Sequence, residues 1–182
     1  TGYGSDGAVW GGEFLIASYR GFQRAAHLKY VPLPGLDQAV CKPFRMAISH
    51  LQVAYGAAAA DLPLDLWERL DRREVAIVRQ QVASGLNAPP TSSCGRLYDA
   101  VASLLGVRDT VSYEGQAAVE LQMLADTDER GSYPWEWSAG AGPSQIDTAP
   151  TVRGIVADLG RRVEREAIAA RFHNTVAEVV VG

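Results

Sequence analysis

The sequence predicts an α+β fold, in which a β-hairpin near the N-terminus is followed by a mainly helical region. Two stretches rich in apolar and β-branched residues, 8–19 and 22–29, flank Arg20-Gly21, and this arrangement favours an antiparallel pair of strands with a tight turn. From Pro43 onward, apolar residues recur every three or four positions, which is the period of a helix. The 182 residues carry no internal repeat, so we expect one structural unit with one sizeable core.

Glycine dominates the first fourteen residues, where it occupies five positions. Glycine at this density allows unusual backbone dihedrals or a close approach to another group. A glycine-rich turn beside a strand can direct backbone N–H groups at a phosphate, because such a nest of amides carries partial positive charge. The alternative is a glycine-rich hairpin that binds nothing.

Helical signals begin after the loop at Pro32 to Gly35, where Asp37 can cap the segment that follows. The regular helix should begin at Pro43, because proline is tolerated in a first turn. Leu62-Pro63 interrupts the chain, and a short helix near residues 66–70 and a second one near 75–82 follow. Gly85 should end the second helix in a left-handed conformation, and residues 87–90 should form an extended linker.

The second half of the chain continues the helical pattern. Thr91-Ser92-Ser93 offers hydroxyls for the N-cap of a helix that should stop at Gly106, and Ser112 can cap the next helix. The alternating residues 133–137 suggest a strand, and Pro134 places it at the edge of a sheet. The chain should then turn at residues 140–143. The two final helices are marked by apolar residues, namely Val152, Ile155, Val156 and Leu159 up to Gly160, and then Ile168, Phe172, Val176 and Val179.

Charge and apolar content exclude several classes of function. The net charge is −4 and the 17 lysines and arginines are scattered, so the basic stripe that tracks nucleic acid is missing. The apolar runs fall short of the roughly 20 residues that cross a bilayer, so we expect no membrane contact and a soluble, cytoplasmic protein. Cys41 and Cys94 lack a Cys-x-x-Cys spacing, and we expect them to be buried free thiols.

Metal and nucleophile signals are weak. His27, His50 and His173 are not paired at helical spacing, so we predict that this chain holds no metal site of its own. The P-loop pattern and a Ser-His-Asp order are absent from the sequence.

The stretch 91–114 is the second candidate site. Ser92, Ser93 and Gly95 form a polar corner at a helix N-terminus, where a sugar or phosphate can dock. Asp99 and Glu114 can accept hydrogen bonds from a ribose. The alternative is purely structural, with the serines as helix caps and Glu114 as an acid favoured in the first turn by the helix dipole.

Four blocks of sequence, in this order and with this spacing, resemble the C-terminal catalytic module of the HypF carbamoyltransferases. The blocks are G-Y-G-S-D-G-A-V-W-G-G-E-F, T-S-S-C-G-R-L-Y-D-A-V-A-S-L-L-G, Y-E-G-Q-A-A-V-E-L and I-A-A-R-F-H-N-T-V-A. The resemblance implies part of an actin-like ATPase fold of the TsaD type. It also implies carbamoyl phosphate and ATP as substrates, carbamoyladenylate as the intermediate, and the C-terminal cysteine of HypE as the acceptor.

By the same resemblance, the loop along the phosphate or carbamoyl end of the adenylate contains Thr1, Gly2, Tyr3 and Gly4. The positions expected to hold the ribose and base are Ser92, Ser93 and Gly95, together with Gly106. The implied mechanism is positioning and charge stabilisation, without a covalent nucleophile.

The family's metal ligands are expected outside this chain. Its paired histidines and an Asp would lie before Thr1 and its final acidic ligand after Gly182, so iron or zinc would be held only in an intact protein. We therefore expect residues 1–182 to be a fragment of the catalytic domain, truncated at both ends and inactive in isolation. Two alternatives remain open: a natural-product O-carbamoyltransferase, and a docking module whose sign would be self-association. The leading hypothesis requires the glycine loop and the serine corner to share one cleft.

Overall fold

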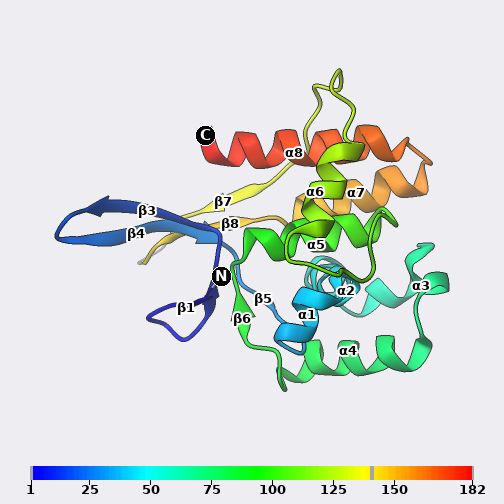
Figure 1. Cartoon of the computed structure of the whole chain (residues 1–182), viewed down its shortest axis with the longest axis horizontal. Coiled ribbons are helices and arrows are strands. Elements are labelled where there is room, and N and C mark those ends of the chain that lie inside the picture. The colour runs from blue at the N-terminus through cyan, green and yellow to red at the C-terminus, as the bar shows by residue number, and fades with distance from the viewer. Residues whose placement is uncertain (1, 140–141, 182) are drawn as a thin grey trace.

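Two small sheets carry the strands of this chain in the computed structural model, which describes residues 2–139 and 142–181 (Figure 1). The first sheet has the order β1-β2-β6-β5 and consists of Gly2–Tyr3, Val9–Trp10, Pro90–Thr91 and Val31–Pro32. The second has the order β3-β4-β8-β7 and consists of Glu13–Ser18, Gly21–Leu28, Ser144–Asp147 and Glu136–Ser138. The α+β class is therefore confirmed.

The predicted hairpin is confirmed, but its first strand is not continuous. β3 and β4 pair antiparallel from Glu13 and His27 to the turn at Ser18 and Gly21, and the hairpin projects away from the helices (Figure 1). The single strand predicted over residues 8–19 is wrong, because Gly11-Gly12 divides it between the two sheets. A Cβ atom on Gly12 would lie 2.3 Å from the Ser92 carbonyl oxygen, so only glycine can pass this point with the backbone as it stands.

Eight α-helices and one 3₁₀ helix lie within the described ranges. The α-helices are α1 Asp37–Cys41, α2 Pro43–Tyr55, α3 Leu66–Arg69, α4 Arg72–Ser84, α5 Cys94–Leu104, α6 Gln116–Leu124, α7 Ala149–Gly160 and α8 Arg165–Val181, and the 3₁₀ helix is Gly56–Asp61. The predicted start of α2 at Pro43 is confirmed, and so is the left-handed glycine after α4, with φ 71° at Gly85. α5 ends at Leu104, close to the predicted stop at Gly106, which is also left-handed with φ 70°.

Three predicted local features are wrong. Asp37 is not a cap but the first residue of α1, and it makes no capping hydrogen bond. Ser112 does not cap α6, because that helix begins after Gly115 (φ 80°), and the Ser112 amide instead donates to the Gln116 side chain at 2.8 Å. Residues 87–90 are not uniformly extended, because Asn87 adopts a left-handed turn conformation with φ 52°.

The strand predicted over residues 133–137 is shorter and shifted, although it does lie at a sheet edge. β7 includes only the last two of those residues, and Tyr133 is held instead by α7 and α8. Its amide donates to Thr175 Oγ1 at 2.8 Å and its hydroxyl donates to Asp158 Oδ2 at 2.9 Å. Side-chain contacts therefore replace sheet pairing here. The turn predicted at 140–143 includes residues 140 and 141, which lie outside the described residues.

The core lies where α2 and α5 cross, with α7 and α8 packed over them (Figure 1). Its largest fully buried side chains include Met46, Ile48, Leu51 and Phe172. Both cysteines are free, but the prediction that they are buried is wrong: Cys41 is exposed and Cys94 is half-buried. Within the described ranges, no helix is long and apolar enough to cross a membrane.

Replacing Gly154 with alanine should destabilise the fold, because the new Cβ atom would lie 2.5 Å from the Tyr133 ring. Tyr133 is held by hydrogen bonds at its backbone amide and at its hydroxyl, so its ring cannot easily move away. We therefore expect a loss of about 1–3 kcal/mol in the free energy of unfolding, measured in urea. Gly160→Ala is the matched control, since a Cβ atom there meets nothing within 4 Å. Equal stability of the two variants would contradict this packing argument.

Candidate functional site

The glycine loop and the start of α5 lie against each other because β2 pairs in parallel with β6. The Val9 carbonyl accepts hydrogen bonds from the Ser92 amide at 3.0 Å and from Thr91 Oγ1 at 2.8 Å. The Cys94 amide donates to the Gly11 carbonyl at 3.2 Å. The two stretches singled out in the sequence are therefore neighbours, although about 80 positions separate them.

The tip of the glycine loop is a closed turn. The Gly4 amide donates to the Ala8 carbonyl at 2.8 Å, and the Gly7 amide donates to the Gly4 carbonyl at 3.1 Å. These two N–H groups are satisfied within the turn and do not form an open nest. Gly2 and Tyr3 lie outside the turn and are exposed, with 70% of the Tyr3 surface accessible. Thr1, which was predicted with them, lies outside the described residues.

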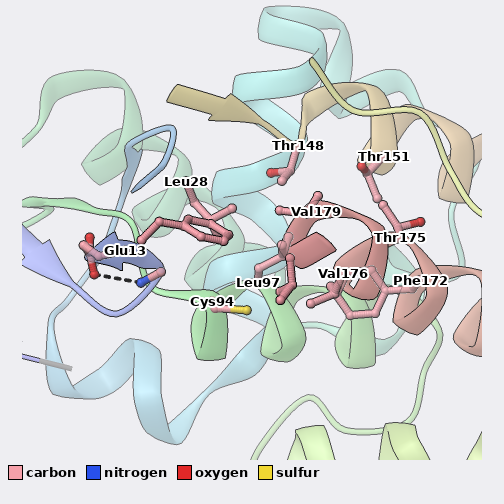
Figure 2. A pocket seen from close by; sticks show the side chains of 13 residues that line it. Glu13, Leu28, Cys94, Leu97, Thr148, Thr151, Phe172, Thr175, Val176 and Val179 are labelled. Carbon is pink, nitrogen blue, oxygen red and sulfur yellow. Dashed lines mark hydrogen bonds between the residues drawn. The ribbon is translucent and has the colours of Figure 1, made fainter. Parts of the chain in front are cut away.

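Glu13 joins the glycine loop to the serine corner. Its Oε2 accepts from the Gly11 amide at 2.6 Å and from the Gly12 amide at 2.9 Å, and the second of these bonds is visible in Figure 2. Its Oε1 accepts from Arg24 Nη2 at 2.7 Å and from the Ser92 hydroxyl. The carboxylate is thus a buried acceptor whose partners come from both stretches, and it fixes their relative position.

Arg24 extends this network to the loop tip. Its guanidinium lies 4.0 Å from the centroid of the Trp10 ring and donates to Asp6 Oδ2 at 3.0 Å. Asp6 also accepts from the Tyr30 hydroxyl and from Trp10 Nε1. The hydrogen bond from Tyr30 is the largest of several contacts that lower the pKa of Asp6 from 3.8 to about 2. The loop is therefore held from its tip to its base by charged hydrogen bonds.

Arg96 and Asp99 lie one turn apart on the buried face of α5, with Arg96 Nε 2.9 Å from Asp99 Oδ2. Although the atoms are close, their alignment does not make a hydrogen bond, and in the described part of the chain Asp99 Oδ2 has no such partner. Burial raises the pKa of Asp99 from 3.8 to about 6, Arg96 opposes the rise, and Glu114 adds to it.

A pocket of about 230 Å³ connects Arg96 to the glycine loop. Its walls are formed by Gly2, Tyr3, Val9, Leu33, Leu36, Asp37, Val40 and Arg96. The site is therefore polar at Arg96 and Asp37 and apolar elsewhere. Gly2 and Tyr3, from the predicted loop, line this pocket, whereas Asp99 contacts Arg96 but is not among the lining residues.

The residues predicted to hold the ribose and base lie at both ends of α5 and differ in exposure. Ser92 and Ser93 are buried, and their hydroxyl oxygens are engaged by Glu13 and by the Arg96 amide, so Ser93 is the cap of α5. Gly95 is exposed in the first turn of that helix. Gly106 is at the other end of α5, about 16 Å away at 1.5 Å per residue, and lies beside the side chains of Arg69 and Arg165. Gly106 is thus not brought together with the serines.

A second pocket, of about 200 Å³, is lined in part by Glu13 (Figure 2). Leu28, Leu97, Phe172, Val176 and Val179 point into it, together with the Cys94 side chain. Burial raises the pKa of Cys94, which favours the thiol over the reactive thiolate. An apolar cavity of this kind cannot solvate a phosphate or a carbamate, so we assign the candidate ligand site to the pocket at Arg96.

The histidines make internal contacts. Nδ1 of His27 lies 2.8 Å from the Leu28 carbonyl, and Nδ1 of His173 lies 2.7 Å from the Ala169 carbonyl. Burial lowers the pKa of His50 to about 4. Across residues 2–139 and 142–181, no three His, Cys, Asp or Glu side chains are grouped as metal ligands.

Sequence reasoning missed Glu13, Arg24 and Arg96. The only available signal for Glu13 was its place directly after the Gly11-Gly12 pair, and for Arg96 its place three positions before Asp99. Neither spacing indicates that the side chain is buried. The partners of Glu13 come from residues 11 and 79 positions away, which no local pattern reveals.

Comparison with known proteins adds independent information. All 182 residues match the family model "Carbamoyltransferase, Kae1-like Domain, second subdomain". The chain is similar to Carbamoyltransferase HypF of Rhodobacter capsulatus, with 41% identity over 97% of this chain and 22% of the relative. It is also similar to the Carbamoyltransferase HypF homolog of Cupriavidus necator, with 36% identity over 100% of this chain and 47% of the relative.

Two solved structures share the fold. One is the crystal structure of full-length HypF in the phosphate- and nucleotide-bound form, with a TM-score of 0.89, 38% identity, and coverage of 99% of this chain and 23% of that chain. The other is the crystal structure of T. kodakarensis HypF, with a TM-score of 0.74, 28% identity, and coverage of 93% and 23%. The chain thus spans less than half the length of each of these relatives.

Proposed function

Because the chain belongs to the HypF carbamoyltransferase family, we propose that it forms part of an enzyme that transfers a carbamoyl group from carbamoyladenylate. In this proposal, carbamoyl phosphate and ATP supply the adenylate, and the acceptor is the C-terminal cysteine of HypE, on the route to the cyanide ligands of NiFe hydrogenases. The chain spans about a quarter of several relatives, so the complete activity would also need the remainder of such a protein.

The observation that carries the nucleotide part of the proposal is the unsatisfied carboxylate of Asp99. A buried carboxylate oxygen without a hydrogen-bond partner is unusual, and a ribose hydroxyl is a donor that would satisfy it. The pocket at Arg96, the ion-pair partner of Asp99, is bounded by Gly2 and Tyr3 of the loop predicted to face the carbamoyl end. The phosphate- and nucleotide-bound state of a structurally similar HypF supports this proposal.

The chain's own contribution would be to bind and orient the adenylate. Asp99 and Glu114 would hold the sugar, while Gly2, Tyr3 and Gly4 would lie along the carbamoyl end. The network through Glu13 would keep these two parts of the site in register, since positioning of reactants can supply much of a rate enhancement. In this proposal Ser92 and Ser93 act from the interior, by fixing Glu13 and capping α5.

The metal belongs to the intact protein in this proposal. Iron or zinc would be held by ligands outside residues 1–182 and would supply Lewis-acid stabilisation of charge. The described side chains do not form a ligand set by themselves. Residues 2–139 and 142–181 therefore serve the nucleotide half of the proposed reaction.

A docking role is favoured by exposed apolar side chains. Leu15, Ile16 and Phe22 on the β3–β4 hairpin, and Val180 and Val181 at the end of α8, are 47–86% accessible. Surfaces of this kind commonly meet another protein or domain. Sedimentation that shows this chain as a monomer would count against self-association.

We expect Asp99→Ala to weaken binding of a non-hydrolysable adenylate analogue by about ten- to a hundredfold, because hydrogen bonds to charged groups contribute about 1.5–3 kcal/mol. Calorimetric titration of the intact carbamoyltransferase and of this chain measures the affinity for the analogue. Asp128→Ala, on an exposed loop, is the matched control. Unchanged affinity in Asp99→Ala, and also in Ser92→Ala and Gly95→Val, would remove the adenosine assignment.

Activity provides the complementary test. The 182-residue chain, incubated with ATP and carbamoyl phosphate, should release no pyrophosphate, whereas the intact protein should. Robust release by the chain alone would show that the active site has been misplaced.

A further inference from the structure

The second sheet carries a row of polar side chains across three strands. His27 of β4 pairs in register with Gln145 of β8, and Gln145 pairs with Ser138 of β7. Residues directly opposite each other in neighbouring strands point to the same face of a sheet. The next residues along β4 and β8, Leu28 and Ile146, are buried in the core, so the polar row lies on the face away from the core.

A β-bulge in β4 brings Arg24 to the same face as His27. The register of β4 against β3 shifts between Phe14 and Leu15, which leaves Ala25 without an opposite residue. An extra residue of this kind moves the alternation of side chains by one position, so that Arg24 and His27 share a face although they are three positions apart. Bulges are common beside functional sites, where they re-aim a side chain.

A pocket of about 420 Å³ lies over this face. Its walls include Arg24, His27, Ser138 and Gln145, together with Asp6 from the glycine loop. Among the described residues, none lines both this pocket and the pocket at Arg96. The two pockets are therefore separate sites.

The polar row has hydrogen-bonding groups to spare. His27 is buried, with 3% of its surface accessible, and its Nδ1 lies 2.8 Å from the Leu28 carbonyl, which can only accept. Nδ1 of the neutral ring therefore carries the proton, and Nε2 is an acceptor. Within residues 2–139 and 142–181, neither Nε2 nor the side-chain amide of Gln145 makes a hydrogen bond, and Gln145 is engaged only through its backbone. Side chains as buried as His27 normally have their polar atoms paired.

The charges of this pocket are already matched. Arg24 forms ion pairs with Asp6 at 3.0 Å and with Glu13 at 2.7 Å, so its positive charge is not available to an anion. Asp6 accepts hydrogen bonds from Arg24, from the Tyr30 hydroxyl and from Trp10 Nε1, so its carboxylate is not available to a cation. The pocket is therefore suited to an uncharged ligand.

Among uncharged groups, a primary carboxamide matches the unused groups of the row. Its carbonyl oxygen and one N–H can pair with the side-chain amide of Gln145, and its second N–H can donate to His27 Nε2. A hydroxyl has a single proton to donate, and an ester has none. The Tyr30 ring and Pro143, which also line the pocket, offer apolar surface to the body of such a ligand.

We propose that this pocket binds a small molecule in which a primary carboxamide is attached to an apolar or aromatic body. Gln145 would recognise the amide by two hydrogen bonds and His27 by a third. The proposal goes beyond the nucleotide-binding function and does not depend on it.

The test compares benzamide with two analogues of the same shape in calorimetric titrations of the intact carbamoyltransferase and of this chain. N,N-dimethylbenzamide lacks both N–H donors, and benzoate lacks them and carries a negative charge. The wild-type protein should bind benzamide at least about tenfold more tightly than either analogue, because two hydrogen bonds are lost with the donors.

Variants locate the binding. Gln145→Ala should weaken benzamide binding about tenfold, and so should His27→Phe, which keeps an aromatic ring but removes Nε2. Gln122→Ala, which alters an exposed glutamine on α6, is the matched control and should bind benzamide like the wild type. Excess ATP should not displace benzamide, because the pocket at Arg96 is a separate site.

Several results would overturn the proposal. Equal wild-type affinity for the three compounds, or no binding of benzamide, would exclude carboxamide recognition. Unchanged benzamide binding in both Gln145→Ala and His27→Phe, or displacement of benzamide by ATP, would place the compound at another site. None of these results would affect the proposed nucleotide binding, which is measured separately with the adenylate analogue. The comparison of ligands uses the wild-type protein alone, so it decides the question even where His27→Phe fails to fold.

Discussion

Replacing Glu13 with alanine is expected to lower the free energy of unfolding by about 3–5 kcal/mol, because its carboxylate accepts four hydrogen bonds and each buried donor left unpaired costs about 1–3 kcal/mol. Arg24 keeps its second carboxylate partner, Asp6. The Glu13 side chain is 7% accessible and that of Arg24 is 9% accessible, so solvent cannot replace the lost contact. The substitution would also leave the Gly11 and Gly12 amides and the Ser92 hydroxyl without their acceptor. Against a total stability of about 5–15 kcal/mol, such a loss approaches unfolding.

Urea denaturation followed by circular dichroism measures this change, with Glu136→Ala as the control because Glu136 is an exposed glutamate on β7. The control should differ from the wild type by less than about 0.5 kcal/mol. Glu13→Gln keeps the shape and an acceptor oxygen but removes the charge. Its loss of unfolding free energy should therefore fall between those of Glu13→Ala and Glu136→Ala. A Glu13→Ala protein as stable as the control would mean that this network does not hold the glycine loop on α5.

The elements that sequence reasoning predicted correctly depend on local chemistry. Pro43 fixes the start of α2, a left-handed glycine ends α4, and Ser93 caps α5, and each of these signals lies within a few residues of its effect. The prediction of one strand over residues 8–19 was wrong because of a contact between residues far apart in the sequence. The strand is divided there because Gly12 faces the carbonyl of Ser92, a contact between residues 80 positions apart. A periodic pattern cannot contain that information.

In the candidate site, too, local signals could be predicted from the sequence and features that depend on the folded structure could not. Asp99 and the loop residues Gly2 and Tyr3 were selected from residue chemistry and from the family resemblance. In the structure Gly2, Tyr3 and Arg96 line one pocket, and Asp99 contacts Arg96 without lining the pocket itself. Arg96 itself was missed because a buried arginine and a surface arginine look alike in a helical pattern. Gly106 was selected from the family resemblance as part of the same ribose and base site, yet the length of α5 places it away from Ser92 and Ser93.

Asp99 should make the stability of the folded protein fall as the pH rises. Its pKa is raised from 3.8 to about 6 by burial, with Arg96 opposing and Glu114 adding to the shift. Between these two values the folded protein binds more protons at this group than the unfolded chain, so the free energy of unfolding decreases with rising pH. The shift of about two units corresponds to about 3 kcal/mol, which is fully present below pH 4 and lost by about pH 7.

Asp99→Asn isolates this effect, because asparagine keeps the shape of the neutral acid but does not titrate. The difference in unfolding free energy between wild type and Asp99→Asn, measured in urea from pH 4 to pH 7.5, should change by about 3 kcal/mol in favour of the variant. Asp128→Asn on an exposed loop should follow the wild type. If the difference in unfolding free energy between wild type and Asp99→Asn does not depend on pH, burial does not raise the pKa of Asp99 in the folded protein. Hydrogen-bond donors that satisfy the ionised carboxylate lower its pKa, so a bound nucleotide should reduce the pH dependence of stability. In Asp99→Asn, nucleotide binding should leave the pH dependence of stability unchanged.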